Sequence, residues 1–427
     1  MRRILKKSSL FWRSSRKVST HTIHRLKVHA HAILDSRGTP TVAVELSNGV
    51  HTVTASVPSS KEASERGARE VRDDDGVHVD TAVANVNGPI AGVLRLAPLD
   101  PILVDRMLVD LDGTKDKSRL GANAILPVSI AMRRLAALHE GIPLWRYIAH
   151  ESNSLPAFPR LYMNMLNGGV HADFRLPFEE YLVVINGRDP EAMYKKATTI
   201  FGRLGRIVSA AHPEVRMGEL AGYAPAIAEL TKPFELLREA IAHDPDTHLG
   251  IDVAASKLYH EGLYFLNGEA HSRKELLALY KDLVERFDIR TIEDPFDAHD
   301  LEGFQAVTKA LGEKALIVGD DLTVTSPELV RRLAFGKAGN ALVIKPNDVG
   351  TISEVYAAAQ IARSAGWELI AAHRLGETSD TFLSDLAVGL GCFGIKAGAP
   401  TQKENRVKYE RLTKIGKEFF ANMPRGK

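Results

Sequence analysis

The chain has 427 residues, a length that favours two domains over one compact core. Its hydrophobic fraction of 44% and charged fraction of 25% are typical of globular proteins, and no apolar run is long enough to cross a bilayer. The single cysteine, Cys392, excludes an intramolecular disulfide and a cysteine-based metal cluster.

Residues 1–25 form a leader with eight Lys and Arg side chains and no acidic one. Without these eight, 47 of the 55 basic residues stand against 53 acidic residues, so the remainder has a formal charge near −6. The basic balance therefore comes from the leader and does not indicate a nucleic-acid partner. We expect a cytoplasmic protein; the alternative is a mitochondrial or other organelle protein, because an acid-free amphipathic N-terminus resembles a transit peptide.

Residues 26–57 alternate apolar and polar side chains, with turn signals DSRGTP and SNG between the runs. This period of two predicts a three-stranded antiparallel sheet. Helical segments follow, including one from Asn123 to about His139 that Gly141 can end. We therefore expect an α+β domain over residues 26–150, followed by the linker HESNSLPAFP.

Strands and helices alternate from residue 157 to residue 427, which predicts a (β/α) barrel. Thr351 and Glu354 form a capping-box pattern at the start of one helix. Ser326 and Pro327 mark the start of another.

Ionisable residues end the strands predicted in this second part. Because active sites of such barrels lie at the C-terminal ends of the strands, we expect these side chains to face one mouth. Three carboxylates at consecutive strand ends are suitable oxygen ligands for Mg²⁺, although each alone would more often be a cap or a solvated acid. The strand-end residues are Asp252, Glu293, Asp320, Lys345, His373 and Lys396.

Lys345 is the candidate base. We expect burial and a nearby cation to lower its pKa; the alternative is an ion pair with Asp320 or Asp321. Lys396 could hold a substrate carboxylate or phosphate, and Arg374 offers bidentate anion recognition.

Two further candidates precede the metal-ligand set. His171 lies in the glycine-rich loop NGGVHADF, where a structural histidine with satisfied hydrogen bonds is the alternative. Glu180 heads the apolar run YLVVI and could reach the same mouth.

The chain resembles the enolase (phosphopyruvate hydratase) family from residue 26 to about residue 420. The resemblance implies an α+β N-terminal capping domain before an irregular (β/α)8 barrel of enolase type. It also implies an Mg²⁺-dependent homodimer that acts on a small phosphorylated carboxylate. The segments that carry it are DSRGTPTV, AVANVNGPI, LVDLDGTKDKSRLGANAIL, MNMLNGGVHAD, GYAP, IDVAAS, TIEDPF, GDDLTVT, VIKPN, HRLGET, DLAVG and IKAGAP.

The resemblance also implies roles for individual residues. Asp252, Glu293 and Asp320 would bind Mg²⁺, and Lys345 would take the proton from the α-carbon of the substrate. Glu180 would be one of two carboxylates near the departing hydroxyl. Substrate contacts would fall to Lys396 at the carboxylate, Arg374 at the phosphate, and His171 and His373 along the closed pocket.

The sequence departs from the family pattern around these residues. Leu220 stands where the second carboxylate is expected, and Glu219 could replace it only if the loop shifts by one residue. Leu375 stands at the position of a serine that grips phosphate. Glu179 stands where glutamine usually precedes Glu180.

The loop that closes on a second metal in the family reads PSSKEAS over residues 58–64. Glu62 stands at the position of its metal-binding serine. This carboxylate could ligate a cation or repel a phosphate, and Lys61 could offset its charge.

Three functional hypotheses follow. The first is an enolase that interconverts 2-phosphoglycerate and phosphoenolpyruvate in glycolysis, slowed by the departures. The second is a non-catalytic enolase-like protein that keeps its metal site for binding or structure. The third is a lyase or racemase on another carboxylate.

Overall fold

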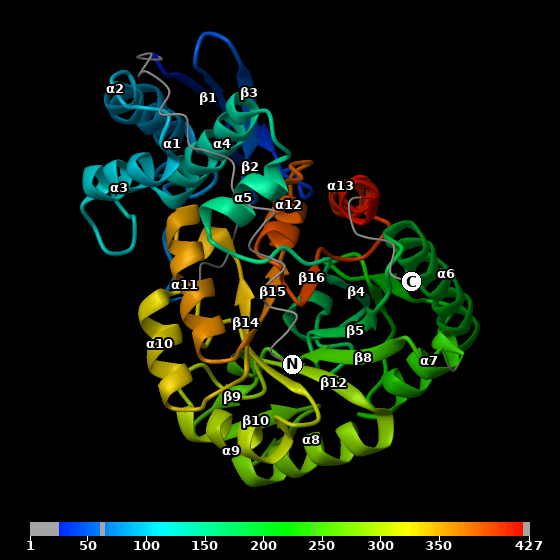
Figure 1. The fold of residues 1–427 in the computed structure, drawn as a ribbon. Helices are drawn as coiled ribbons and strands as arrows, with labels where there is room; N and C mark the ends of the chain where they lie inside the picture. Colours follow the sequence, from blue (N-terminus) through cyan, green and yellow to red (C-terminus); the bar gives the residue numbers. More distant parts are fainter. Residues whose placement is uncertain (1–24, 60–64, 243, 422–427) are drawn as a thin grey trace, which may run out of the picture.

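The computed structural model describes residues 25–59, 65–242 and 244–421. The predicted roles of Glu62, of Lys61 and of most of the leader fall outside these residues. Figure 1 shows the N-terminal sheet and its helices grouped beside a barrel built from the rest of the chain. Within the described residues, no helix combines the length and apolar character needed to span a membrane.

The N-terminal part contains the predicted antiparallel meander, with its strands in the order β1-β2-β3. Val42, Val44 and Leu46 have no exposed surface, so the sheet forms one wall of a hydrophobic core. The strands are β1 (Lys27–Leu34), β2 (Pro40–Ser47) and β3 (Thr52–Ser56). The helices are α1 (Asp80–Asn85), α2 (Ala91–Leu94), α3 (Pro101–Asp112), α4 (Ala122–Glu140) and α5 (Leu144–Glu151), with a π-helical turn at Val86–Ile90.

Helix α4 packs on β2 and β3 and confirms the helix predicted after Asn123. It ends at Gly141, whose φ of 68° is left-handed and favours glycine. Helix α5 continues to Glu151, so the first two residues of the predicted linker are helical instead.

The second part is a closed barrel of eight strands, because β16 pairs with both β15 and β4. The fold prediction is therefore confirmed. The barrel strands are β4 (Arg160–Asn167), β5 (Glu180–Ile185), β8 (Thr247–Asp252), β12 (Ile289–Glu293), β13 (Leu316–Gly319), β14 (Ala341–Ile344), β15 (Glu368–Ala372) and β16 (Gly394–Lys396).

Strand β5 makes the barrel irregular, because it runs antiparallel to both of its neighbours, β4 and β8. Its first residue therefore lies at the barrel end where the other strands finish. Glu180 is paired in register with Asp252, the last residue of β8. This reversed strand brings Glu180 to the predicted mouth.

Helices surround the barrel in Figure 1, and two of them begin at the predicted caps. The Thr351 side chain accepts a hydrogen bond from the Glu354 N–H, and that of Ser326 accepts one from the Leu329 N–H. The helices are α6 (Pro190–Ala211), α7 (Lys232–Ile241), α8 (Arg273–Phe287), α9 (Leu301–Leu311), α10 (Pro327–Phe335), α11 (Ile352–Ser364), α12 (Phe382–Gly389) and α13 (Lys403–Ala421). Short strands outside the barrel are β6 (Arg216–Met217), β7 (Tyr223–Ala224), β9 (Tyr259–His260), β10 (Leu263–Leu266) and β11 (Glu269–His271).

A bidentate ion pair joins the two parts. The guanidinium of Arg134 on α4 donates to both carboxylate oxygens of Asp380, at 2.7 and 2.6 Å. It also donates to the Thr54 carbonyl of β3 at 2.6 Å.

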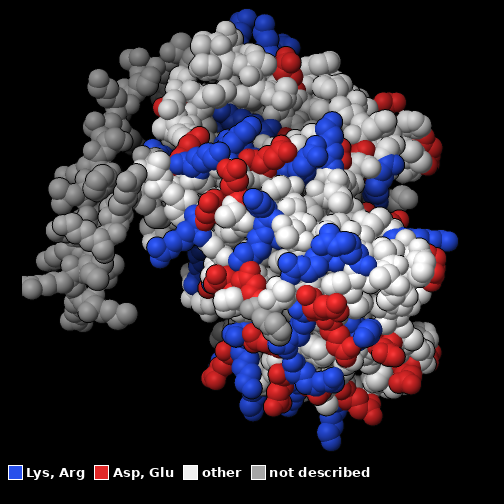
Figure 2. Space-filling view, turned by 90° about the vertical axis from the view of Figure 1, so that its right-hand side faces the viewer, with Lys and Arg blue, Asp and Glu red and all other residues white. Residues whose placement is uncertain are grey.

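On the face shown in Figure 2, basic and acidic side chains are interspersed.

Candidate active site

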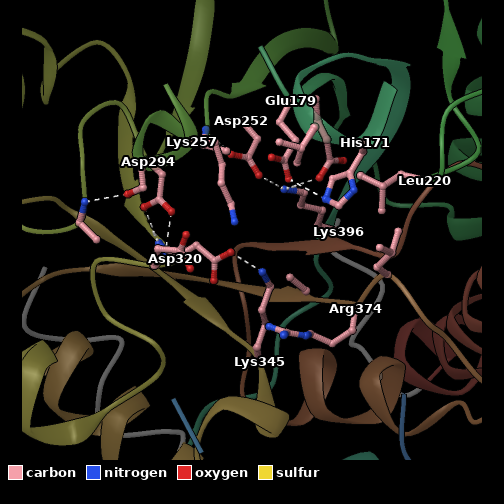
Figure 3. A pocket seen from close by; sticks show the side chains of 18 of the residues that line it. His171, Glu179, Leu220, Asp252, Lys257, Asp294, Asp320, Lys345, Arg374 and Lys396 are labelled. Atoms are coloured by element: carbon pink, nitrogen blue, oxygen red, sulfur yellow. Dashed lines mark hydrogen bonds and ion pairs between the residues drawn. The ribbon is translucent and has the colours of Figure 1, made fainter. Parts of the chain in front are cut away.

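A cavity of about 710 Å³ opens at the barrel mouth, where side chains far apart in the sequence meet (Figure 3). It collects most of the predicted site residues. Glu293 does not line the cavity but is buried and contacts a residue that does. The predicted residues that line it are His171, Glu180, Glu219, Asp252, Asp320, Lys345, His373, Arg374 and Lys396.

Lys396 stands at the centre of a buried cluster of carboxylates. Its ammonium lies 2.7 Å from Asp252 Oδ2, 2.9 Å from Glu180 Oε1 and 3.1 Å from Glu293 Oε1. Burial acts to lower the pKa of Lys396, but the three carboxylates outweigh it and raise that pKa well above its ordinary value. Lys396 is therefore a fixed positive charge.

The carboxylates of this cluster do not share its negative charge equally. Burial, together with the charge of Asp252, raises the pKa of Glu293 well above its usual range. For Asp252, burial also acts to raise the pKa, but Lys396 outweighs it and the pKa is lowered. Asp252 is thus the firmly ionised member of the cluster.

Glu180 has one oxygen available for a ligand. Burial raises its pKa against the opposing charge of Lys396. Its Oε2 atom is buried and has no hydrogen-bond partner within the part of the chain that the structure describes. An unsatisfied buried oxygen beside a cavity favours a ligand that donates a hydrogen bond there.

Lys345 forms an ion pair with Asp320, the structural alternative considered above. Burial acts to lower the pKa of Lys345, but the charge of Asp320 outweighs it and the pKa is raised. The expectation of a lowered pKa is therefore wrong for the polypeptide alone, because its own carboxylate lies against the amine. The Lys345 N–H donates to Thr325 Oγ1 at 2.9 Å, which holds the strand end in place.

His373 and Arg374 follow β15 and face the same cavity. Burial and the charge of Lys396 lower the pKa of His373 well below its ordinary value, so its ring is neutral. Arg374 Nη1 lies 3.0 Å from Asp348 Oδ1, and this pair positions the guanidinium at the cavity wall.

The N-terminal part holds the segment after Arg374. The Ser36 N–H donates to the Glu377 carbonyl at 2.7 Å, and the Ser59 N–H donates to the Gly376 carbonyl at 2.8 Å. A Cβ atom on Gly376 would lie 2.1 Å from Asp35 Oδ2, so glycine is required here. The turn DSRGTP thus helps to shape the side of the cavity where Arg374 lies.

His171 lies between two carboxylates. Its Nε2 atom is 3.2 Å from Glu179 Oε1, and its Nδ1 atom is 3.0 Å from Glu219 Oε2. Burial acts to lower the pKa of His171, but these carboxylates raise it to about 9. The ring is therefore satisfied, as in the structural alternative, and it also lines the cavity.

Leu220 is buried and lies beside His171 at the cavity wall (Figure 3). Its neighbour Glu219 also lines the cavity, but its half-exposed carboxylate contacts the His171 ring and does not occupy the place of the Leu220 side chain. A turn in which the Gly218 N–H donates to the Gly222 carbonyl at 2.8 Å holds this arrangement.

Asp294 and Lys257 are among the cavity residues that the sequence reasoning missed. Asp294 accepts hydrogen bonds from the N–H groups of Asp320 at 2.9 Å and Asp321 at 2.8 Å, and so orients the end of β13. A second acid directly after Glu293 was its available signal. Lys257, whose ammonium points into the cavity in Figure 3, follows β8 in a 3-10 turn and carried no strand-end signal.

The donor chemistry of the site fits Mg²⁺. Asp252, Glu293 and Asp320 come from adjacent strands, and Asp252 and Glu293 are partners in register. In the structure, the ammonium groups of Lys396 and Lys345 contact these carboxylates. Among the described residues, no group of three or more His, Cys, Asp or Glu is already arranged to bind a metal. All three donors are oxygens, and their negative charge is the kind that a hard divalent cation neutralises.

Comparison with known families and proteins identifies the chain. Residues 26–148 match "Enolase, N-terminal domain", and residues 155–424 match "Enolase, C-terminal TIM barrel domain". The chain belongs to the enolase family. An enolase of Methanopyrus kandleri is 40% identical over 414 residues, which cover 92% of this chain and 96% of that protein. An enolase of Thermococcus gammatolerans is 38% identical over 407 residues, which cover 92% of this chain and 94% of that protein.

Proposed function

We propose that this member of the enolase family is an Mg²⁺-dependent lyase that reversibly dehydrates 2-phosphoglycerate to phosphoenolpyruvate in glycolysis. The observation that carries the proposal is the single cavity in which Lys345 faces strand-end carboxylates, with Lys396 and Arg374 on its walls. Such a site suits removal of a proton next to a carboxylate, where negative charge develops.

Lys345 is the general base in this proposal. Asp252, Glu293 and Asp320 would hold Mg²⁺, which supplies positive charge beside the substrate carboxylate. If Asp320 were so engaged, Lys345 would lose the partner that raises its pKa, and burial would then favour the neutral amine that can accept the α-proton.

The remaining cavity residues bind and orient the substrate. Lys396 faces the carboxylate, and Arg374 faces the phosphate with its planar guanidinium. Neutral His373 lines the pocket between them. Glu180, whose pKa burial raises, lies on the side of the departing hydroxyl.

A spectrophotometric assay of phosphoenolpyruvate formation at saturating Mg²⁺ tests the proposal. The full-length protein should turn over 2-phosphoglycerate, and Lys345→Ala should lower the rate by ~10²–10⁴-fold, the usual contribution of a general base. A wild-type rate no higher than that of Lys345→Ala would refute the proposal.

Leu220 favours a second candidate, a non-catalytic enolase-like protein that keeps the metal site for a binding or structural role. This candidate predicts Mg²⁺ binding without turnover. The same assay, run beside a calorimetric Mg²⁺ titration, separates the two.

The proposal includes a homodimer that works in the cytoplasm. Sedimentation equilibrium tests the homodimer, and the expected mass is twice the 46.8 kDa mass of one chain. A mass equal to one chain across micromolar concentrations would contradict it.

A further inference from the structure

A histidine flanked by two carboxylates lies next to Leu220 at the cavity wall. We propose that His171, positioned by Glu179 and Glu219, is the acid that protonates the departing hydroxyl, a role that Leu220 cannot fill. This inference rests on the proposed function and names the residue that completes its second step.

Exposure of the three side chains falls from Glu219 through His171 to Glu179. The Glu219 side chain is 55% exposed, that of His171 is 19% exposed and that of Glu179 is 15% exposed. The two carboxylates engage different ring nitrogens, so each favours the doubly protonated ring. The Nε2 proton is engaged by Glu179, the less exposed of the two carboxylates, so in the proposed step it passes from this contact to the departing oxygen.

The backbone holds the three residues in this order. The Glu219 N–H donates to the His171 carbonyl at 3.0 Å, and the Gly168 N–H donates to the Glu179 carbonyl at 3.0 Å. A Cβ atom on Gly169 would lie 3.2 Å from Glu179 Cα, so the 3-10 turn that carries His171 packs closely on Glu179. The ring position is therefore determined from both sides.

The charges around His171 support its protonated state. Glu179 and Glu180 act from the start of β5, and Glu219 acts from the turn between β6 and β7. The Lys396 ammonium contacts Glu180 at 2.9 Å, and it also contacts Asp252 and Glu293. With a pKa of about 9, His171 carries its proton at neutral pH.

The proposed step balances in atoms and charge. Lys345 takes the α-proton and leaves its electron pair on the α-carbon. That pair forms the C=C bond as the C–O bond to the hydroxyl breaks, and the C–O electron pair goes to the oxygen. The Nε2 proton of His171 joins that oxygen, which leaves as water. The neutral ring then regains a proton from solvent.

The experiment separates the two halves of the reaction in the full-length protein with Mg²⁺. Loss of deuterium from the α-carbon of 2-phosphoglycerate reports proton abstraction, and phosphoenolpyruvate formation reports hydroxyl departure. His171→Gln should keep deuterium loss and lower elimination by ~10²-fold. The matched control is Glu229→Gln, an exposed glutamate after β7 that should change neither rate.

Glu219→Gln tests the positioning role and keeps the fold, because Glu219 is half-exposed. Without this carboxylate, the alkaline limb of the elimination rate should move to lower pH. Adding Leu220→Glu to His171→Gln should restore elimination, because a direct carboxylate returns to the pocket wall.

Three outcomes decide the matter. Elimination that is unchanged in His171→Gln and in Glu219→Gln would overturn the inference and leave the proposed function standing. Deuterium loss that falls in parallel with elimination would also overturn it, since His171 would then act before hydroxyl departure. A wild-type protein that shows neither rate would instead overturn the proposed function together with the inference.

Discussion

Replacement of Lys396 by methionine should strongly destabilise the barrel. The substitution keeps most of the side-chain volume, so the cavity contribution is small. It removes the ammonium that lies 2.7 Å from Asp252, 2.9 Å from Glu180 and 3.1 Å from Glu293. Removing one partner of a buried ion pair costs about 3–5 kcal/mol of unfolding free energy.

We expect the lower end of that range, about 3 kcal/mol, because a carboxyl with a raised pKa can take up a proton when its partner is lost. Burial raises the pKa of both Glu180 and Glu293. Urea unfolding at pH 7, followed by tryptophan fluorescence, measures the change as a shift in midpoint at constant slope.

The matched control is Lys417→Met. The Lys417 side chain is 70% exposed and lies 3.2 Å from Glu191, which is 68% exposed, so its loss should leave the midpoint unchanged. A Lys396→Met midpoint equal to that of the control would show that Lys396 does not compensate the buried carboxylates, and the electrostatic account of the cavity would be wrong.

Three other perturbations follow from the contacts. The stabilising effect of His171 should be full below pH 6.5, its ordinary pKa, and be lost as pH rises through about 9. The unfolding free energies of wild type and His171→Gln should therefore converge at alkaline pH. A constant difference between them would contradict this. Arg134→Ala should cost about 3–5 kcal/mol of unfolding free energy, because it leaves the Asp380 carboxylate without its ion-pair partner. In the same urea measurement, the double variant with Asp380→Ala should cost less. Additive losses would argue against the pair. Gly376→Ala should cost about 1–3 kcal/mol of unfolding free energy through overpacking. It should also weaken the affinity for phosphate in a calorimetric titration. An affinity equal to that of the wild type would show that this segment does not position the anion site.

Strand-end chemistry was the part of the site that the sequence could predict. Each short apolar run ends at an ionisable residue, and in a parallel barrel those ends meet. Asp252, Glu293 and Lys396 are the last residues of their strands, whereas Asp320 and Lys345 come directly after theirs. Cap residues were equally local signals, which is why the helix starts at Ser326 and Thr351 could be read directly.

Features that depend on direction or on distant contacts could not be predicted this way. The residues of the run YLVVI do not show in which direction the strand runs in the barrel. The sequence alone therefore did not show that Glu180 reaches the mouth through an antiparallel strand. The raised pKa of Lys345 depends on a carboxylate 25 residues away, and the contact between His171 and Glu219 spans 48 residues. Such pairs follow from loop geometry, which the residue pattern does not encode.

Solvent exchange of the α-proton tests the central claim most directly, because it reports the Lys345 amine at work on a carboxylate substrate. With Mg²⁺ and α-deuterated 2-phosphoglycerate, the wild-type protein should release deuterium to water, and Lys345→Ala should release it ~10²–10⁴-fold more slowly. Equal release by the two proteins, or none by either, would contradict the account.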